Sequence, residues 1–424
     1  MLLLLWQSIQ NATLKKLKNK IINDPVHGFI QIPEGLPFEI IEHPYFQRLR
    51  RIKQLGLTHF VYPGALHTRF HHALGAMHLM QLALKTLCQK GHFISENEEQ
   101  AALAAILLHD IGHGPFSHTL EHSILEGVNH EALTVAFMKK LNQEWNGALT
   151  LTIAMFEGTY HRPFFHQLVS SQLDMDRMDY LRRDCYFTGV VEGNISAERI
   201  IKMLDLHHDR LVVEAKGIYS IENFITSRRL MYWQVYLHKT TVSAEEMLIQ
   251  TMRRAKQLSQ SHTEIYLPEA LAFFFKNPVV QADFDARPEL IDLFAQIDDT
   301  DVWYALKRWQ YHSDKVLSYL SKSLLNRTLA SLSLQMEPHT EEAYALQMQR
   351  TMRNLDLNEN EAGFLVIRGE ISNAAYLPAN DQILIKKKSG EVMDVAMASD
   401  LPNIAALSTV LKKYYLCYPK QLPL

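Results

Sequence analysis

The stretch Leu107–His118, LLHDIGHGPFSH, places a histidine beside an aspartate directly behind an apolar run. The preceding AALAAI, followed by Leu107 and Leu108, predicts a helix that is buried on nearly every side. A buried His109–Asp110 pair costs free energy unless the two side chains have a partner. The stretch therefore indicates either a packed core with a hydrogen-bonded histidine or a metal site.

A metal site needs more ligands than this pair can supply. Successive residues on a helix diverge by about 100°, so His109 and Asp110 reach one ion beside the helix without completing its shell. His72 upstream and Asp176 downstream are the candidates from other helices, and the set suits Mn, Fe, Zn, Co or Ni. A lone HD dipeptide is usually a salt-bridged or capping pair. Here the earlier histidine and the carboxylate-rich LDMDRMDYLRRD favour the metal.

The composition is that of an ordinary soluble globular protein, with 424 residues, 47% hydrophobic and 21% charged. A net charge of -3 provides no basic field, so nucleic acid is not an expected partner. Three cysteines without a CxxC pair argue against a disulfide framework and predict a cytoplasmic location. The apolar start MLLLLWQ is too short to span a bilayer and predicts a strand or docking segment, so no membrane partner is expected.

Helical periodicity dominates the chain from about residue 39 to residue 260. Stretches with apolar residues at three- and four-residue spacing are 43–56, 71–89, 98–112, 129–143 and 244–258. Residues 205–224 predict a small hairpin with AKG, 215–217, at its turn. Helical patterns return from 268 to 334, and β-branched runs broken by Asn, Gly and Ser-Gly follow. We therefore predict a mainly α fold, with a helical core over 1–335 and a smaller C-terminal α+β lobe over 336–424.

Six motifs in a fixed order then define a resemblance over about residues 20–260. They are NDPVHGFI, HPYFQRLRRIKQLG, YPGALHTRFHHALG, LLHDIGHGPFSHTLE, NHE and LDMDRMDYLRRDC. In these motifs the chain resembles the HD-domain phosphohydrolases. Within them it is most similar to the dNTP triphosphohydrolases that include the sterile-alpha-motif-and-HD-domain enzymes and their bacterial relatives. The resemblance implies an HD-domain helical core.

The resemblance also implies roles for the matching positions. Residues that match the metal ligands are His72, His109, Asp110 and Asp176. Residues that match catalytic positions are His118, Glu121, His130 and Glu131, with Glu121 standing where the branch has Asp. Residues that match the phosphate and deoxyribose contacts are Arg69, Arg177, Tyr180, Asp184 and Lys239. The match at Lys239, in MYWQVYLHKTTV, needs a one-residue shift.

Elementary chemistry agrees with these roles. A divalent metal, here one of Mn, Fe, Zn, Ni, Co or Mg, together with Arg side chains can neutralise a triphosphate. Water beside such an ion becomes a nucleophile near neutral pH, and His118 is the type of residue that donates a proton to a leaving alkoxide. Tyr180 either abuts the sugar or packs in the core.

The NDPVHG segment and the QRLRRIKQLG stretch match a regulatory nucleotide site of the family. Residues in matching places are Asn23, Glu42, Arg48, Arg50 and Gln54. Glu42 replaces an Asp that some members use for guanine recognition, and Asn-Asp-Pro is equally the signal of a structural turn.

We therefore expect metal-dependent hydrolysis of dNTPs to deoxynucleoside and tripolyphosphate, by water attack at the α-phosphorus, in a homo-dimer or homo-tetramer. The first alternative is an HD-domain phosphodiesterase or phosphatase for another nucleotide or phosphoester, and extra histidines such as His113 leave room for a second metal. The second alternative is a nucleotide-binding module with a silent site.

Overall fold

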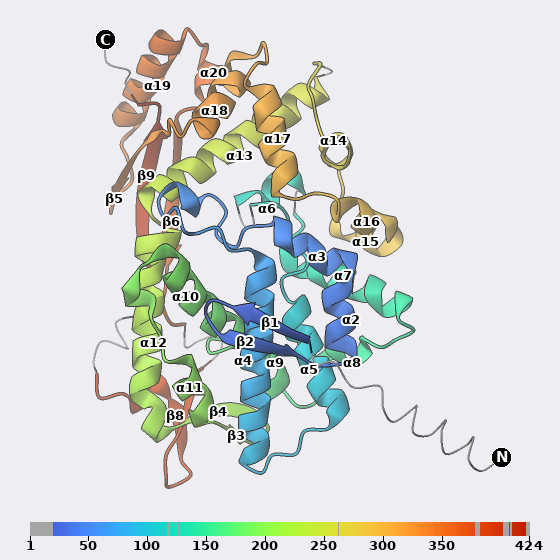
Figure 1. Cartoon of the computed structure of the whole chain (residues 1–424). Coiled ribbons are helices and arrows are strands. Elements are labelled where there is room, and N and C mark those ends of the chain that lie inside the picture. Colours follow the sequence, from blue (N-terminus) through green and yellow to red (C-terminus); the bar gives the residue numbers. More distant parts are fainter. Residues whose placement is uncertain are drawn as a thin grey trace, which may run out of the picture.

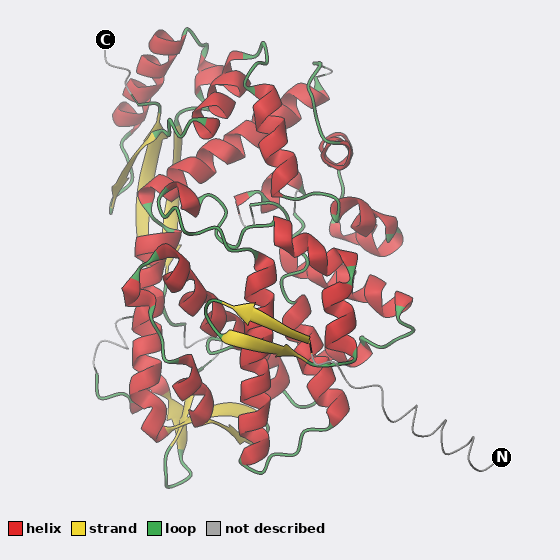
Figure 2. Cartoon of the chain, viewed as in Figure 1, coloured by secondary structure: helices red, strands yellow, loops and turns green. Residues whose placement is uncertain are grey.

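The computed structural model describes residues 20–116, 119–125, 127–261, 263–377, 382–401, 407 and 409–420. The apolar start MLLLLWQ, predicted as a strand or docking segment, lies outside these residues. Helices dominate the described chain, and the strands gather in three small sheets around them (Figure 2). The predicted mainly α fold with a C-terminal α+β region is confirmed.

Helix α4 (Arg69–Gln89) is central to the core and packs against α5 (Glu96–Leu108) and α10 (Met175–Thr188) (Figure 1). Helix α5 starts at a capping box, in which the Ser95 side chain accepts from the Glu98 N–H and Glu98 accepts from the Ser95 N–H. Its following residues, AALAAILL, are all buried. The apolar run therefore brings the HD pair into the interior at the end of α5, as the sequence predicts.

Other helices surround this core. In chain order the further α-helices of the first half are α2 (Leu36–Glu42), α3 (Pro44–Arg48), α6 (Glu121–Ile124), α7 (His130–Glu144), α8 (Thr150–Phe156), α9 (Phe164–Val169), α11 (Ala197–Met203) and α12 (Ile218–Met231). Those of the second half are α13 (Lys239–Gln260), α14 (Glu269–Lys276), α15 (Gln281–Ala286), α16 (Glu289–Phe294), α17 (Asp299–Trp309), α18 (Lys315–Leu325), α19 (Glu341–Leu355), α20 (Glu359–Ala362) and α21 (Val395–Ala398). Short 3₁₀ turns are η1 (Leu49–Arg51), η2 (Thr58–Phe60), η4 (Val191–Gly193) and η5 (Ala215–Gly217), and η6 (Tyr232–Tyr236) is a π-helix. None of the described helices is both long and apolar enough to cross a membrane.

The strands form three sheets. The first is the antiparallel hairpin β1 (Lys20–Asp24) and β2 (Gly28–Ile32). The second has the order β3-β4-β7-β8, with β3 (Leu204–His207), β4 (Arg210–Glu214), β7 (Leu384–Lys386) and β8 (Val392–Asp394). The third has the order β5-β9-β6, with β5 (Ser331–Gln335), β9 (Leu411–Tyr418) and β6 (Ile367–Asn373).

The C-terminal segment is divided between two of these sheets. Strands β6 and β9 join β5 beside α13, whereas β7 pairs in parallel with β4, so that Val213 lies opposite Ile385. Strand β5, just before the predicted boundary at 335/336, pairs with β9 far beyond it. The division into 1–335 and 336–424 stays a prediction.

Two local predictions were wrong. The hairpin within 205–224 turns at His208 and Asp209, both of positive φ, because consecutive left-handed residues make the tight turn that fits strand twist; AKG instead forms a 3₁₀ turn. The stretch 43–56 is not one helix. Helix α3 ends at Arg48 and η1 ends at Arg51, and the following Ile52 is extended and accepts from the Arg69 N–H.

Candidate metal centre

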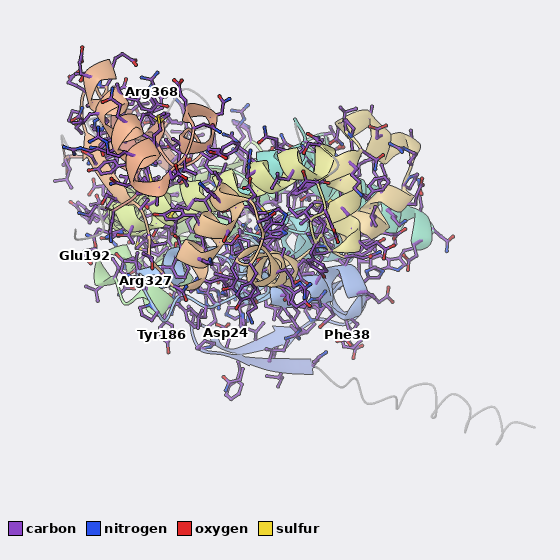
Figure 3. All side chains as sticks on the ribbon, turned by 90° about the horizontal axis from the view of Figure 1, so that it is seen from above. Asp24, Phe38, Tyr186, Glu192, Arg327 and Arg368 are labelled. Atoms are coloured by element: carbon purple, nitrogen blue, oxygen red, sulfur yellow. The ribbon has the colours of Figure 1, made fainter. Side chains whose placement is uncertain are left out.

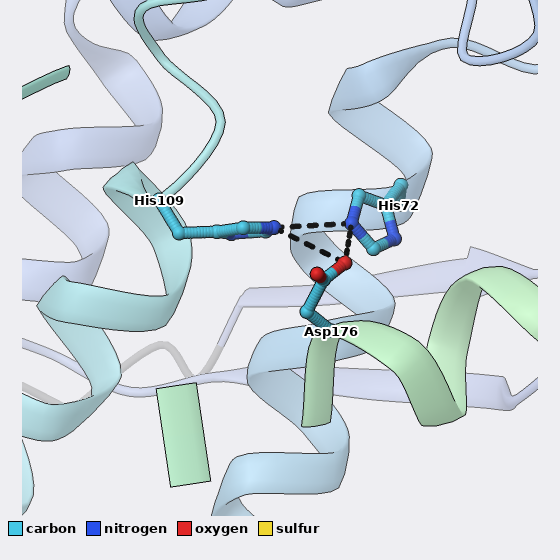
Figure 4. A group of neighbouring side chains, drawn as sticks. All are labelled: His72, His109 and Asp176. Atoms are coloured by element: carbon cyan, nitrogen blue, oxygen red, sulfur yellow. Dashed lines mark hydrogen bonds and ion pairs between the residues drawn. The ribbon is translucent and has the colours of Figure 1, made fainter. Parts of the chain in front are cut away.

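Three side chains from three helices converge in the core (Figure 4). His72 Nε2 lies 3.2 Å from His109 Nε2 and 3.0 Å from Asp176 Oδ1, and His109 Nε2 lies 3.4 Å from the same oxygen. Two imidazole nitrogens and a carboxylate oxygen are a ligand set that transition metals accept. The group could therefore hold a metal ion.

The local structure of each helix places its ligand. His72 lies in the first turn of α4. His109 follows α5 directly, and its Nδ1 donates to the Ile106 carbonyl at 2.6 Å, so its Nε2 faces the cluster. Asp174 caps α10 by accepting from the Arg177 N–H at 2.6 Å, which puts Asp176 in the first helical turn. The ends of three helices, the start of α4, the end of α5 and the start of α10, thus bring His72, His109 and Asp176 together.

Asp110, the fourth predicted ligand, adjoins the other three. Its oxygens lie 3.5 Å from His109 Nε2 and 3.7 Å from His72 Nε2. It also accepts a hydrogen bond from the Arg69 guanidinium. The structure thus brings all four predicted ligands together, with Asp110 also joining the cluster to a cationic side chain.

The electrostatics show that this group attracts positive charge. Burial opposes the charged form of His72, but hydrogen bonds to Asp176 and Asp179 outweigh it and raise the pKa of His72 to about 10. Burial would likewise raise the pKa of Asp176, yet its hydrogen bonds with His109 and His72 hold that pKa well below its usual range. A cation bound here would take the place of these protons.

A second group of side chains lies next to Asp110. His113 Nε2 is 3.3 Å from Asp110 Oδ1, and the His113 ring stacks on His130 with centroids 4.0 Å apart. Burial and the nearby Arg69 lower the pKa of His113 well below its usual value, which keeps this ring neutral.

Glu121 binds His130. Its Oε1 accepts from the His130 backbone N–H at 2.7 Å and from His130 Nδ1 at 2.8 Å. The predicted partner His118 lies outside the described residues. Glu131, in the first turn of α7, is exposed.

A cavity of about 640 Å³ opens beside the cluster. Predicted site residues that line it are Gln54, Arg69, Asp110, His130, Asp176, Arg177, Tyr180 and Asp184. Lys239 is exposed at the start of α13, and it and Glu131 lie outside this lining in the described chain. Gln54, predicted for a regulatory site, faces this cavity instead.

The other predicted regulatory residues do not gather into one pocket with Gln54. Arg48 is 1% exposed and donates to the carbonyls of Ile111, His113 and Ile297, so its guanidinium is occupied within the core. Exposed residues of this set are Asn23 on the hairpin, Glu42, which pairs with Lys20, and Arg50, whose guanidinium lies over the Phe70 ring.

The sequence patterns did not indicate that the two tyrosines of the π-helix belong to the site. Tyr232 and Tyr236 both line the cavity, and Tyr236 Oη donates to Asp184 Oδ2 at 2.7 Å. The other Asp184 oxygen accepts from His67 Nε2 at 2.7 Å. A π turn holds one residue more than an α turn, so the three- and four-residue spacing of apolar residues did not predict it.

Comparisons with known proteins agree with this geometry. The family model described as HD domain matches residues 69–184, and the model described as HD associated region matches 195–267. The crystal structure of a phosphohydrolase from Bacteroides thetaiotaomicron has a TM-score of 0.91 and 52% identity, covering 95% of this chain and 100% of that one. The uncharacterized protein YwfO of Bacillus subtilis is 31% identical, over 96% of this chain and 94% of its own length.

More distant relatives carry a stated activity. Deoxynucleoside triphosphate triphosphohydrolase SAMHD1 of Gallus gallus is 29% identical over 64% of this chain and 53% of its own length. The human protein of that name is 28% identical over 56% of this chain and 44% of its own length. Because these matches extend along nearly the whole chain and His72, His109 and Asp176 converge within the matched HD domain, the protein belongs to the HD-domain phosphohydrolase family.

Proposed function

We propose that the protein hydrolyses deoxynucleoside triphosphates to deoxynucleoside and tripolyphosphate with the help of a divalent metal ion. One observation carries the proposal. A single cavity is lined by Asp110 and Asp176 of the metal centre, by two arginines, and by Tyr180 with Asp184. The names of the SAMHD1 relatives support the substrate class.

The cation would be held by His72, His109 and Asp176 with Asp110 beside them, and it would supply charge neutralisation and an activated water. Every other part of the reaction falls to the chain. Arg69 lies at the metal end of the cavity and is oriented by Asp110, so it is suited to a phosphate oxygen. Arg177, anchored to Asp174 at 2.9 Å, supplies a second cationic contact.

Proton transfer would use the histidines that follow the HD pair. Glu121 accepts from His130 Nδ1 and so fixes the ring, which turns its other nitrogen away from the carboxylate. His118, in the neighbouring segment, remains the predicted donor to the leaving sugar oxygen. Glu131 and Lys239 remain predicted contacts of a substrate-bound state.

Recognition of the deoxyribose would rest on the tyrosines. The ring centroids of Tyr180 and Tyr236 are 6.1 Å apart, and Asp184 fixes Tyr236 through its hydroxyl. A rigid aromatic wall is the simplest way to exclude an added 2′-hydroxyl. The occupied second oxygen of Asp184, bonded to His67, keeps the carboxylate in place.

The protein is also expected to form a homo-dimer or homo-tetramer. Large apolar side chains of the hairpin and α2 are exposed, with Ile21 55%, Phe29 74% and Phe38 38% accessible. Light scattering of the purified chain measures the assembly, and a monomer at all concentrations would contradict this expectation.

The decisive experiment is product analysis. Purified protein is incubated with each dNTP and each NTP in the presence of Mn²⁺, Co²⁺, Ni²⁺, Zn²⁺, Fe²⁺ or Mg²⁺, and ion chromatography separates tripolyphosphate, pyrophosphate and phosphate. Tripolyphosphate in equimolar amount with deoxynucleoside is expected. Equal rates with NTPs, or release of phosphate alone, would favour the more general phosphohydrolase. Binding without turnover would favour a silent nucleotide-binding module, and Asp176→Asn serves as the inactive control.

A further inference from the structure

A buried carboxylate lies behind the metal ligand His72, on the side away from the cluster. Asp179 Oδ2 is 2.8 Å from His72 Nδ1, and both side chains are 0% exposed. Because an ionised carboxylate only accepts hydrogen bonds, this contact holds the proton of His72 on Nδ1. When a bound cation takes the place of the proton on Nε2, the lone pair of that nitrogen is therefore directed toward His109 and Asp176.

Asp179 is itself held by two further residues. His27 Nε2 lies 2.7 Å from Asp179 Oδ1. The Arg183 guanidinium donates to both oxygens, from Nε at 2.9 Å and from Nη2 at 3.0 Å. Each carboxylate oxygen thus accepts two hydrogen bonds, and the orientation of Asp179 is fully determined.

The turn between β1 and β2 supplies one of these partners and anchors the other. Asp24 Oδ1 accepts the backbone N–H groups of Val26 and His27 at 2.9 Å each. Asp24 Oδ2 accepts from Arg183 Nη1 at 2.8 Å. The hairpin lies against α4 in Figure 1, and Figure 3 labels Asp24 where the hairpin meets the helices. The turn is therefore joined to the metal ligand by two routes, one through His27 and one through Asp24 and Arg183.

We propose that His27 and Asp179 are positioning residues for the metal ligand His72, so that the β1–β2 turn sets the metal affinity of a centre that it does not touch. The second partner of a ligating histidine fixes its ring and raises its basicity, and loss of such a partner typically costs about 10- to 100-fold in metal affinity. His27 is separated from Asp179 by 152 residues and its side chain is 1% exposed. This inference rests on the proposed metal centre.

The test compares metal affinity with fold stability. Wild type, His27→Ala and His27→Gln are titrated with Co²⁺ and Mn²⁺ in competition with a chelator, and thermal unfolding is recorded for each variant with and without metal. Gln31→Ala is the matched control, because Gln31 is exposed on the same hairpin. We expect His27→Ala to lose about 10- to 100-fold in affinity, His27→Gln to recover most of it through its amide N–H, and Gln31→Ala to bind as wild type.

Two results would overturn the proposal. One is a His27→Ala protein whose metal-free unfolding temperature falls while its metal affinity equals that of wild type. The other is equal loss in Gln31→Ala. If His27→Ala does not fold, Asp179→Asn is measured in its place, and unchanged affinity there would equally overturn the proposal. A wild type that binds neither ion would instead refute the metal centre itself, so the two failures are distinguishable.

Discussion

At the scale of single residues, His72 and His109 of the candidate metal centre each use one ring nitrogen for a hydrogen bond within the protein and present the other to the cluster. His72 gives Nδ1 to Asp179, and His109 gives Nδ1 to the Ile106 carbonyl. Both Nε2 atoms are thereby directed at Asp176 before any cation arrives. Side chains that are already oriented bind a metal without an additional free-energy cost for ordering them.

Replacing Asp176 by Ala should abolish metal binding while the fold is retained. The carboxylate is the one anionic ligand of the convergent three, and its loss leaves two imidazoles that then compete for protons. Metal content after gel filtration and circular dichroism measure the two effects. His161→Ala, at an exposed histidine, is the control. Full metal occupancy in Asp176→Ala would contradict the assignment.

His130→Ala should keep the metal and lower turnover by about 10²-fold or more, the usual scale of general acid–base catalysis. The reason is the Glu121–His130 hydrogen bond, which orients a proton-transferring ring at the cavity. His118→Ala is expected to behave likewise. The kcat, metal content and unfolding temperature of both variants show which histidine transfers the proton. A histidine whose replacement leaves turnover at the wild-type value has no role in that transfer.

At the scale of elements, the metal centre depends on the close packing of α4 against α10. Gly75 lies one turn beyond His72 on α4. A Cβ atom at Gly75 would lie 1.9 Å from Asp179 Oδ1 and 2.3 Å from Arg183 Nη2. The glycine is therefore required by space, because α10 brings its charged side chains against the α4 backbone at this position.

Gly75→Ala is expected to destabilise the protein although alanine is the better helix former. Higher helix propensity would contribute about 1 kcal/mol, but overpacking at such a contact costs about 1–3 kcal/mol and displaces Asp179 from His72. Urea unfolding measures the free energy, and Lys85→Ala, exposed on the same helix, is the control. An unchanged or higher unfolding free energy in Gly75→Ala would show that the two helices separate at little cost.

At the scale of the whole molecule, the C-terminal sheet completes the cavity that starts at the metal centre. Glu370 and Ile371 of β6 and Tyr415 of β9 line its far side, together with Glu245 and Glu246 of α13. Tyr415 Oη donates to Glu246 at 2.7 Å. In the described lining, Arg69 and Arg177 therefore lie at the metal end, beside Asp110 and Asp176, whereas the sheet end holds glutamates and no arginine or lysine. Phosphates are therefore expected at the metal end.

Glu245 should make stability depend on pH. Burial, with a smaller contribution from Glu246, raises the pKa of Glu245 to about 8 from the ordinary 4.5. Between these values the folded chain holds a proton that the unfolded chain has released, so this contribution to stability falls as pH rises and is fully lost above about pH 8. Glu245→Gln should therefore gain stability relative to wild type from about pH 5 to pH 8. Urea unfolding across this range measures the difference, with the exposed Glu269→Gln as control, and a difference that does not change with pH would contradict the prediction.

Much of the fold and of the site can be read from local sequence. The apolar run into His109 and Asp110 predicts a buried helix end, and three-to-four periodicity predicts most core helices, because burial on a helix obeys a short repeat. The family resemblance implied a common site for His72, Asp176, Arg69, Arg177, Tyr180 and Asp184, and all six lie in the candidate metal centre or line the cavity beside it. The patterns failed where backbone geometry set the end of an element: at Ile52, whose carbonyl accepts from the Arg69 N–H, and at the turn made by the left-handed His208 and Asp209.

The sequence by itself determined the helical core and the types of side chain available to bind a metal, and with them the chemistry that such a site permits. These properties depend on residue identity and on spacing within one element. The tertiary structure alone decided which residues share a carboxylate or a cavity. His27, Asp24, Asp179 and Arg183 become one network only when the hairpin packs on α4 and α10. Packing between distant elements likewise places Gln54 at the cavity and Arg48 in the core. Contacts between residues far apart in the chain are selected by packing of whole elements, and no local repeat encodes them.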